Sequence, residues 1–386
     1  MSATDPDRHF VAEDDYDEAA ELQLLDRADL DAPTWLLIWR RFLHHRLGVI
    51  SAVYLLAIYL SLPFVDFLAP YDYAARHEDH IYAPPQAVRL WSAETDYFGL
   101  HTYSTTETFD RDTFQMKSET DWSRPLPIPL FSGCGPTYRV LGLFETNFRL
   151  MCPPEGGTLF IFGTDRLGRD VHSRIIHGAL LSLTVGLIGV AVSFAIGLTL
   201  GGIAGYFGGI VDSLTMRAIE IIRSLPELPI WLALSAAIPA NWGPVSVFFV
   251  ISIILGLLDW PGLARAVRSK FLALREEDYV KAAELMGARP RRIIAVHMMP
   301  NFMSHLVASA TLSIPAMILG ETALSFLGLG LRAPAVSWGL MLNDALDLTV
   351  VEIYPWLLMP LLPVILVVLA FSFLGDGLRD ALDPYS

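Results

Sequence analysis

The chain has 386 residues, of which 53% are hydrophobic and only 18% charged, whereas soluble domains have about 25% charged residues. Its net charge of −14 is concentrated at the start, because residues 1–32 contain eleven Asp and Glu against two Arg. The composition excludes an ordinary soluble enzyme, and the acidic balance excludes a nucleic-acid binder, since phosphate binding needs a basic face. We therefore expect an integral membrane protein in which residues 1–33 form an acidic, disordered tail.

Several segments are long and apolar enough to cross a membrane, for which about 20 residues suffice. The run 228–258 counts as two spans, because turn-forming residues from Pro239 to Pro244 interrupt it. Glycines from 197 to 209 predict close helix packing followed by a turn. Six transmembrane helices are thus predicted: 47–65, 178–211, two within 228–258, 302–320 and 353–375.

The distribution of Lys and Arg predicts the orientation, because cytoplasmic loops carry most of these residues. Residues 262–301 contain eight of them, whereas 327–352 contain only Arg332. A basic stretch also precedes the first span, at the end of an amphipathic lead-in that makes up 34–69 together with that helix. We therefore expect 262–301 and both termini to be cytoplasmic in a multi-pass protein of the inner (cytoplasmic) membrane.

Residues 70–160 are predicted to form an extracytoplasmic insert between the first two helices. The insert is rich in Tyr, Thr, Asp, Pro and Trp, and its aromatic residues form either a small core or a contact surface for a solute or binding protein. It also contains Cys134 and Cys152. A disulfide in an oxidising compartment and two reduced thiols in a small core are both open interpretations.

The loop 262–301 is predicted to contain two short helices. The first, 276–286, begins with acidic residues, which are favourable at the positive end of a helix dipole. Gly287 suits the left-handed residue that ends a helix, and Pro290 suits the first turn of the next helix. The small Ala282 and Ala283 would let a partner surface approach closely. The alternative is an amphipathic helix pair resting on the lipid surface.

The sequence KAAELMGARPRRIIAVHMMPN, residues 281–301, resembles the EAA loop of ABC-importer permeases. Lys281 stands where the family usually has Glu, His297 at an apolar position and Met299 where Leu is usual. On this resemblance, the ATPase-coupling loop comprises Lys281, Ala282, Ala283, Glu284, Gly287, Arg291 and Pro300.

Three further segments are similar to the C-type permease subunit of dipeptide, oligopeptide and nickel importers: GTDRLGRDVHSRIIHGALLSL (163–183), ETALSFLGLGLRAPAVSWG (321–339) and GDGLRDALDP (375–384). The resemblance covers about 160–386 and 35–72 but does not explain the insert. For the charged residues of the first segment we favour a local salt-bridge scaffold over a ligand site. This outer-face signature comprises Gly163, Thr164, Asp165, Gly168, Arg169, Asp170, Ser173 and Arg174.

The resemblance implies an all-α integral membrane protein with the type I ABC importer permease fold, whose core spans 161–386. It implies a permease subunit that moves peptides or a similar small oligomeric solute into the cytoplasm. The implied partners are a homologous B-type permease subunit, two ABC ATPase subunits, an extracytoplasmic substrate-binding protein and the lipid bilayer.

The chain itself has no Walker loop of the form G-x-x-x-x-G-K-[ST]. We therefore expect no enzyme activity and no bound cofactor in this chain, with ATP and Mg used by the partner ATPases. The residues His172, His177 and His297 are too scattered to predict a metal site.

Glu321 is a pore or vestibule candidate near the outer end of the fifth span, because intramembrane carboxylates are costly and often functional. A packing role at the outer vestibule is favoured over direct solute contact. The alternative function is an ion-coupled secondary transporter, which usually shows inverted repeats and carboxylates at mid-membrane. No segment of this sequence is present in a second copy.

Overall fold

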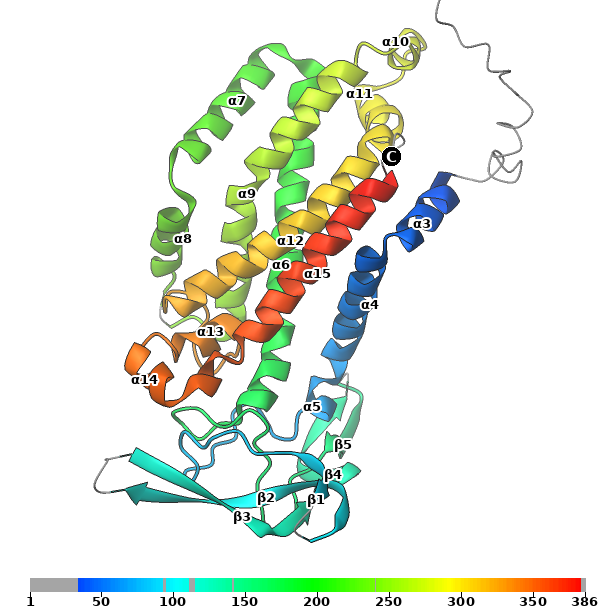
Figure 1. Cartoon of the computed structure of the whole chain (residues 1–386). Helices are drawn as coiled ribbons and strands as arrows, with labels where there is room; N and C mark the ends of the chain where they lie inside the picture. Colours follow the sequence, from blue (N-terminus) through cyan, green and yellow to red (C-terminus); the bar gives the residue numbers. More distant parts are fainter. Residues whose placement is uncertain (1–33, 93–94, 111–114, 141, 240, 383–386) are drawn as a thin grey trace, which may run out of the picture.

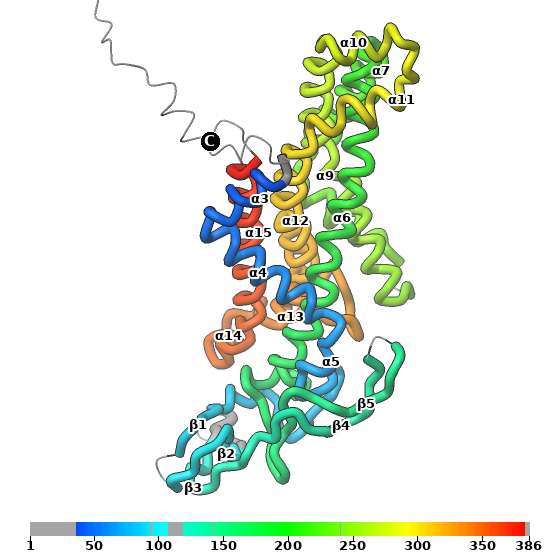
Figure 2. The backbone as a smooth tube through the Cα atoms, turned by 90° about the vertical axis from the view of Figure 1, so that its right-hand side faces the viewer, coloured from blue at the N-terminus to red at the C-terminus, as the bar shows by residue number. Residues whose placement is uncertain are grey.

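The computed structural model describes residues 34–92, 95–110, 115–140, 142–239 and 241–382, so the predicted acidic tail lies outside the described residues. A helical bundle carries a β-structured insert at one end and the short helix α10 (Asp278–Leu285) at the other (Figure 1). We call these the insert end and the α10 end. Helix α3 (Thr34–His44) and the last turn of α15 (Leu361–Leu382) both lie toward the α10 end in two perpendicular views (Figures 1 and 2).

In the part of the chain that the structure describes, five helices are long and apolar enough to cross a membrane. Helix α4 (Arg46–Ser61) leads through a 3₁₀ turn into α5 (Val65–Leu68), and α12 (Met303–Phe326) follows a short irregular helical segment that begins at α11 (Pro290–Arg292). Helices α13 (Trp338–Asn343) and α14 (Leu348–Ile353) lie between α12 and α15 at the insert end (Figure 1). The five spans are Arg46–Leu68, Val171–Phe207, Pro244–Leu274, Pro290–Phe326 and Pro355–Leu382.

The third predicted span does not take the predicted form. Helix α8 (Glu227–Ala236) has only ten residues, about 15 Å or half of the hydrocarbon thickness. It continues the direction of α7 (Gly209–Ser224), and the two helices together return from the α10 end toward the insert end (Figure 1). The break between them follows from Pro226, since Leu225 is extended as residues before proline prefer to be. The charged residues of α7 hide this helix from a search for apolar runs.

Helices α6 (Val171–Phe207) and α9 (Pro244–Leu274) pack backbone against backbone. A Cβ atom added at Gly201 would lie 2.5 Å from the carbonyl oxygen of Ala264, and one at Gly205 would lie 2.8 Å from that of Arg268. The chain then turns at Gly208, where φ is +64°. The predicted role of these glycines in close packing and a turn is therefore confirmed.

The insert contains five strands in its described residues, so the all-α prediction holds for the bundle but is wrong for this region. Three strands form an antiparallel sheet in the order β1-β2-β3, and the other two form a separate hairpin. The stretch 97–110 is rich in Tyr, Thr and Phe, which favour strands. The strands are β1 (Arg89–Ser92), β2 (Tyr97–Asp110), β3 (Gln115–Pro127), β4 (Leu130–Val140) and β5 (Phe144–Met151).

The β4–β5 hairpin is attached to the end of the first span. The Arg149 guanidinium, 2% exposed, donates to the carbonyl oxygens of Asp66 at 3.2 Å and Ala69 at 2.7 Å. It also donates to the carbonyl of Cys134 at 3.3 Å, and Cys134 is disulfide-bonded to Cys152 with 6.0 Å between their Cα atoms. Of the two interpretations of these cysteines, the structure therefore has the disulfide and not the pair of reduced thiols.

Candidate functional site

Helix α10 rests on an apolar base at the end of the bundle. Val280 and Ala283 are buried against a cluster that includes Phe271, Ile293 and Met298. Ala283 therefore faces the protein core, whereas Ala282 is exposed. The prediction that both alanines present a small surface to a partner is wrong for Ala283.

Gly287 ends α10 in the expected left-handed conformation, with φ at +77°. Its N–H donates to the carbonyl of Glu284 at 2.9 Å, and the N–H of Ala288 donates to that of Ala283 at 3.0 Å. This pair of bonds is the Schellman motif, which satisfies carbonyls that a helix end leaves free. An added Cβ at Gly287 would meet nothing within 4 Å, so only the backbone conformation restricts this position to glycine.

The tip of α10 exposes apolar side chains. Leu285 is 90% exposed and Met286 is 81% exposed. The charged side chains beside this tip have polar partners within the protein. Lys281 Nζ lies 3.2 Å from Glu276 Oε2, and the Tyr206 hydroxyl donates to Glu284 Oε1 at 2.8 Å. The Lys281 that replaces the family's usual Glu thus pairs within its own loop.

The segment after α10 is irregular before it becomes a spanning helix. Residues Ile293–Met298 form a π-helical turn, and Pro300 follows in a 3₁₀ turn. The Asn301 side chain donates to the Tyr279 hydroxyl at 2.8 Å and so ties this segment to α10. Arg291 and Pro300, both predicted members of the coupling loop, are exposed.

At the insert end, the outer-face signature forms a buried ion-pair cluster around Asp165, which is 1% exposed. Asp165 Oδ1 accepts the N–H groups of Leu167 and Arg169 at 2.8 and 3.0 Å. Its Oδ2 pairs with Arg169 Nε at 2.7 Å and with Arg174 Nη1. The sequence missed Asp344, whose carboxylate also faces this cluster, with Arg166 Nε at 3.1 Å and Arg174 Nη1 at 3.8 Å.

Asp170 caps the first turn of α6. Its Oδ2 accepts the Ser173 N–H at 2.8 Å and the Ser173 hydroxyl at 2.6 Å. Burial raises the pKa of the Asp170 carboxyl to about 7. Burial also raises the pKa of Asp344 above its ordinary range, although its arginine neighbours oppose that shift.

The glycines and Thr164 of the signature attach the cluster to the segment 77–83. Gly163 and Gly168 have φ of +74° and +69°. A Cβ at Gly168 would collide with the His77 backbone, whose N–H donates to the Gly168 carbonyl at 2.9 Å. The Thr164 hydroxyl accepts the Ala83 N–H at 2.8 Å. These contacts give the signature a local structural role at the place where the insert joins α6.

Glu321 is fully buried and does not open onto a vestibule. Its Oε1 accepts the hydroxyls of Ser325 at 2.7 Å and Ser337 at 2.8 Å. Those hydroxyls in turn accept the N–H groups of Leu331 and Leu340 at 3.0 and 3.1 Å. Glu321 thus organises the connection between α12 and α13, which agrees with packing rather than with direct solute contact.

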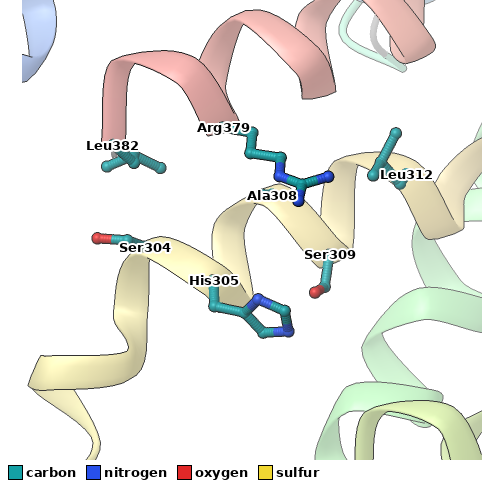
Figure 3. A pocket seen from close by; sticks show the side chains of 7 residues that line it. All are labelled: Ser304, His305, Ala308, Ser309, Leu312, Arg379 and Leu382. Atoms are coloured by element: carbon teal, nitrogen blue, oxygen red, sulfur yellow. The ribbon is translucent and has the colours of Figure 1, made fainter. Parts of the chain in front are cut away.

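Two cavities adjoin the half of α12 nearest the α10 end. One cavity of about 330 Å³ lies between α12 and the end of α15, where Arg379 extends over Ala308 and Leu312 (Figure 3). A second of about 340 Å³ lies between α12, α6 and α9. Both are lined by His305, Ser309 and Leu312, and we call the two together the α12 groove.

The mainly apolar lining of the α12 groove includes a row of polar side chains on α12. His305, Ser309 and Ser313 repeat every four residues along α12 and so lie on one face. Across the second cavity lies Asp259 of α9, whose Oδ2 accepts the Ser193 hydroxyl at 3.0 Å. Sequence reasoning missed these residues, although the spacing of His305, Ser309 and Ser313 carried the signal. Among the described residues no group of three or more His, Cys, Asp or Glu side chains is placed to hold a metal ion.

Two family models match the chain. Residues 34–85 match the N-terminal TM domain of oligopeptide transport permease C, and residues 197–385 match the binding-protein-dependent transport system inner membrane component. Neither match includes the strands of the insert.

Relatives match over more than half of the chain. The dipeptide transport system permease protein DppC of Bacillus subtilis (strain 168) is 42% identical over 58% of this chain and 68% of its own length. The oligopeptide transport system permease protein OppC of Haemophilus influenzae is 39% identical over 67% of this chain and 81% of its own length. An inward-facing structure of the MetNI methionine ABC transporter is a distant likeness, 20% identical with a TM-score of 0.40 over 54% of this chain and 96% of that one.

Proposed function

Because the chain belongs to the C-type permeases of binding-protein-dependent ABC importers, we propose that it forms half of a pathway that carries peptides into the cytoplasm. The peptide assignment rests on relatives named as dipeptide and oligopeptide permeases. A B-type permease subunit completes the pathway, two ABC ATPase subunits drive it with ATP and Mg, and an extracytoplasmic binding protein delivers the solute.

The observation that carries this proposal is the exposed tip of α10 on its buried base. Leu285 and Met286 present apolar surface beyond the end of the bundle, while Val280 and Ala283 fix the helix to α9 and the start of α12. Exposed apolar patches of this kind mark sites of association. Movement of α10 by an ATPase is transmitted through that base to two spanning helices, a rigid-body mode of switching.

The same proposal sets the orientation. The α10 end is cytoplasmic, because Arg289, Arg291 and Arg292 follow α10 directly and such residues favour the cytoplasmic side. The described starts and ends of the chain, at α3 and α15, are then cytoplasmic as well, and the insert is extracytoplasmic.

We assign the solute path to the α12 groove. Polar side chains within spanning helices face the bundle interior or a water-filled cavity. His305, Ser309 and Ser313 have this placement, opposite Asp259. A second permease subunit facing this groove would close it into a channel.

The first test is co-purification of the tagged chain in mild detergent, with mass spectrometry of its partners. Recovery of a second permease and of P-loop ATPases supports the proposal. A homo-oligomer whose uptake continues without any ATPase overturns it in favour of the ion-coupled transporter.

Two matched pairs of variants separate docking from conduction. Leu285→Glu is expected to release the ATPase. The native Leu348 side chain is 82% exposed at the insert end, and the control variant Leu348→Glu is expected to retain the ATPase. Ser309→Phe is expected to abolish uptake while the ATPase stays bound, because the ring fills the groove. The neighbouring Val307→Phe lines neither cavity and is expected to leave uptake intact. Uptake unchanged in Ser309→Phe would remove the groove assignment and leave the docking assignment standing.

A further inference from the structure

The β4–β5 hairpin has an apolar tip, where turns are normally polar. The sequence from 140 to 144 is VLGLF, and the described tip residues Leu143 and Phe144 are 74% and 73% exposed. Isolated apolar residues on a surface need no explanation, but a contiguous exposed patch indicates a binding surface.

The hairpin also exposes aromatic side chains at its base. Phe131 and Phe148 are 59% and 44% exposed, and their ring centroids lie 6.3 and 6.1 Å from that of Phe67. Phe67 belongs to α5, the last turn of the first membrane span. The hairpin's aromatic residues therefore adjoin the end of a helix that crosses the bilayer.

The first spanning helix carries an exposed apolar stripe that ends at α5, next to the base of the hairpin. Val53, Leu56, Leu60 and Phe64 are spaced by three or four residues, so they share one face of the helix, and each is at least 45% exposed. Phe67 extends the spacing by one more step. An exposed apolar stripe on a membrane-spanning helix suits contact with lipid, and at Phe67 it adjoins the aromatic residues of the hairpin.

The direction of the hairpin agrees with this continuity. In both views the hairpin rises from the insert toward the bundle, and its tip reaches the level of α5 (Figures 1 and 2). The sheet β1-β2-β3 instead lies below the bundle, with its long strands running across the end of the helices (Figure 1).

The hairpin is also held rigidly and carries little charge on its exposed surface. Arg149 is buried in hydrogen bonds to the end of the first span, and the Cys134–Cys152 disulfide closes the base. The other two charged residues of the hairpin pair with each other, with 2.7 Å between Arg139 Nη2 and Glu145 Oε1. A compensated pair beside exposed aromatic rings suits the boundary between lipid headgroups and hydrocarbon, where amphipathic side chains gather.

We propose that the β4–β5 hairpin is a membrane-surface anchor whose tip, Leu143 and Phe144, inserts into the lipid interface beside the first spanning helix. The partner is the bilayer itself. The anchor fixes the insert against the membrane next to the first span, and this role depends on neither the solute nor the ATPase.

Spin labelling tests this directly, because both native cysteines are disulfide-bonded and an introduced cysteine is the reactive one. The variants Leu143→Cys, Phe144→Cys and the control Phe98→Cys are labelled and reconstituted in vesicles of phosphatidylethanolamine and phosphatidylglycerol. Phe98 is 82% exposed but belongs to the sheet β1-β2-β3, not to the hairpin. All three side chains are mostly exposed, so the substitutions remove little packing, and non-reducing electrophoresis verifies the native disulfide.

The label at positions 143 and 144 is expected to collide several-fold more with oxygen, and several-fold less with a water-soluble nickel chelate, than the label at position 98. Equal access of the chelate to all three sites overturns the proposal. Access of the chelate in the reconstituted chain, lost only when partner subunits are added, also overturns it and assigns the patch to a protein partner.

Discussion

At the insert end, buried charges and hydrogen bonds hold the chain in one arrangement, whereas at the α10 end a helix is held on one face only. Asp165 is 1% exposed, accepts hydrogen bonds from two backbone N–H groups and forms ion pairs with two arginines. Around α10 the corresponding pairs are exposed, such as Lys281 with Glu276, and contribute little to stability. The rigid part of α10 is its apolar base.

The difference indicates which end of the molecule stays fixed and which end suits association with another subunit. A buried ion pair is costly to break, since the loss of one partner leaves an uncompensated charge. Such a cluster suits a junction that stays fixed while the bundle changes shape. An exposed helix tip with an apolar surface suits association with a separate subunit.

The largest effect is expected at the centre of the buried cluster. Asp165→Asn leaves Arg174, 3% exposed, without its nearest carboxylate, at a cost of about 3–5 kcal/mol in the free energy of unfolding. Denaturant or thermal unfolding of the purified protein in detergent measures this loss. Glu145→Gln breaks the exposed pair with Arg139 and is the control, with little expected change. Equal stability of the two variants would contradict the contrast between buried and exposed pairs.

The next effect is expected at the base of the hairpin. Replacing Cys134 and Cys152 together by Ser removes a cross-link that closes a loop of 18 residues, which stabilises by about 3 kcal/mol. We expect faster hydrogen exchange in 130–151, with unchanged exchange in α6 and α9. Unaltered exchange in the hairpin would show that Arg149 alone holds it to the first span.

A smaller effect on stability, but a specific one on coupling, is expected at Gly287. Gly287→Val places a β-branched residue at φ +77°, where strain costs about 1–2 kcal/mol. We expect normal membrane insertion with reduced ATPase retention and uptake.

The matched control for Gly287 is Gly156→Val. Gly156 has φ +71° and also has open space around an added Cβ, but it lies in the insert region. We expect this variant to bear the same backbone strain and to retain coupling. If Gly287→Val transports normally, the Schellman turn at the end of α10 has no part in docking.

The most gradual effect is a change in pH dependence at Asp170, because it is spread over several pH units. Burial raises its pKa to about 7 in the native protein, against 3.8 in the unfolded chain. Between these values the native state binds more protons, so the free energy of unfolding falls as the pH rises, by at most about 1.4 kcal/mol per unit. Asp170→Asn is expected to flatten this slope between pH 4 and 7, with Asp344 supplying what remains. An unchanged slope in unfolding measurements would show that Asp170 is ionised throughout.

Several sites were predictable because their signals are local in the sequence. Gly287 follows a short helical segment and marks its end, Pro290 marks the start of the next helix, and the structure places both there. The pair of short helices α7 and α8 was not predicted, because the charges of α7 interrupt the apolar pattern while Pro226 breaks the helix. The direction of Ala283 was also missed, since the face that a short helix buries depends on what lies beneath it.

The sequence by itself determined the membrane class, most of the spanning helices, the α10 loop and its family resemblance, because these depend on composition and on residues close together in the chain. Only the tertiary structure decided that Asp344 joins Asp165 and Arg174, that Arg149 fixes the hairpin to Asp66 and Ala69, and that Glu321 is buried away from any vestibule. Those contacts join residues separated by 80 residues or more, or depend on which side of a helix a connection covers. No local spacing encodes such pairings, because they arise when whole helices and strands pack together.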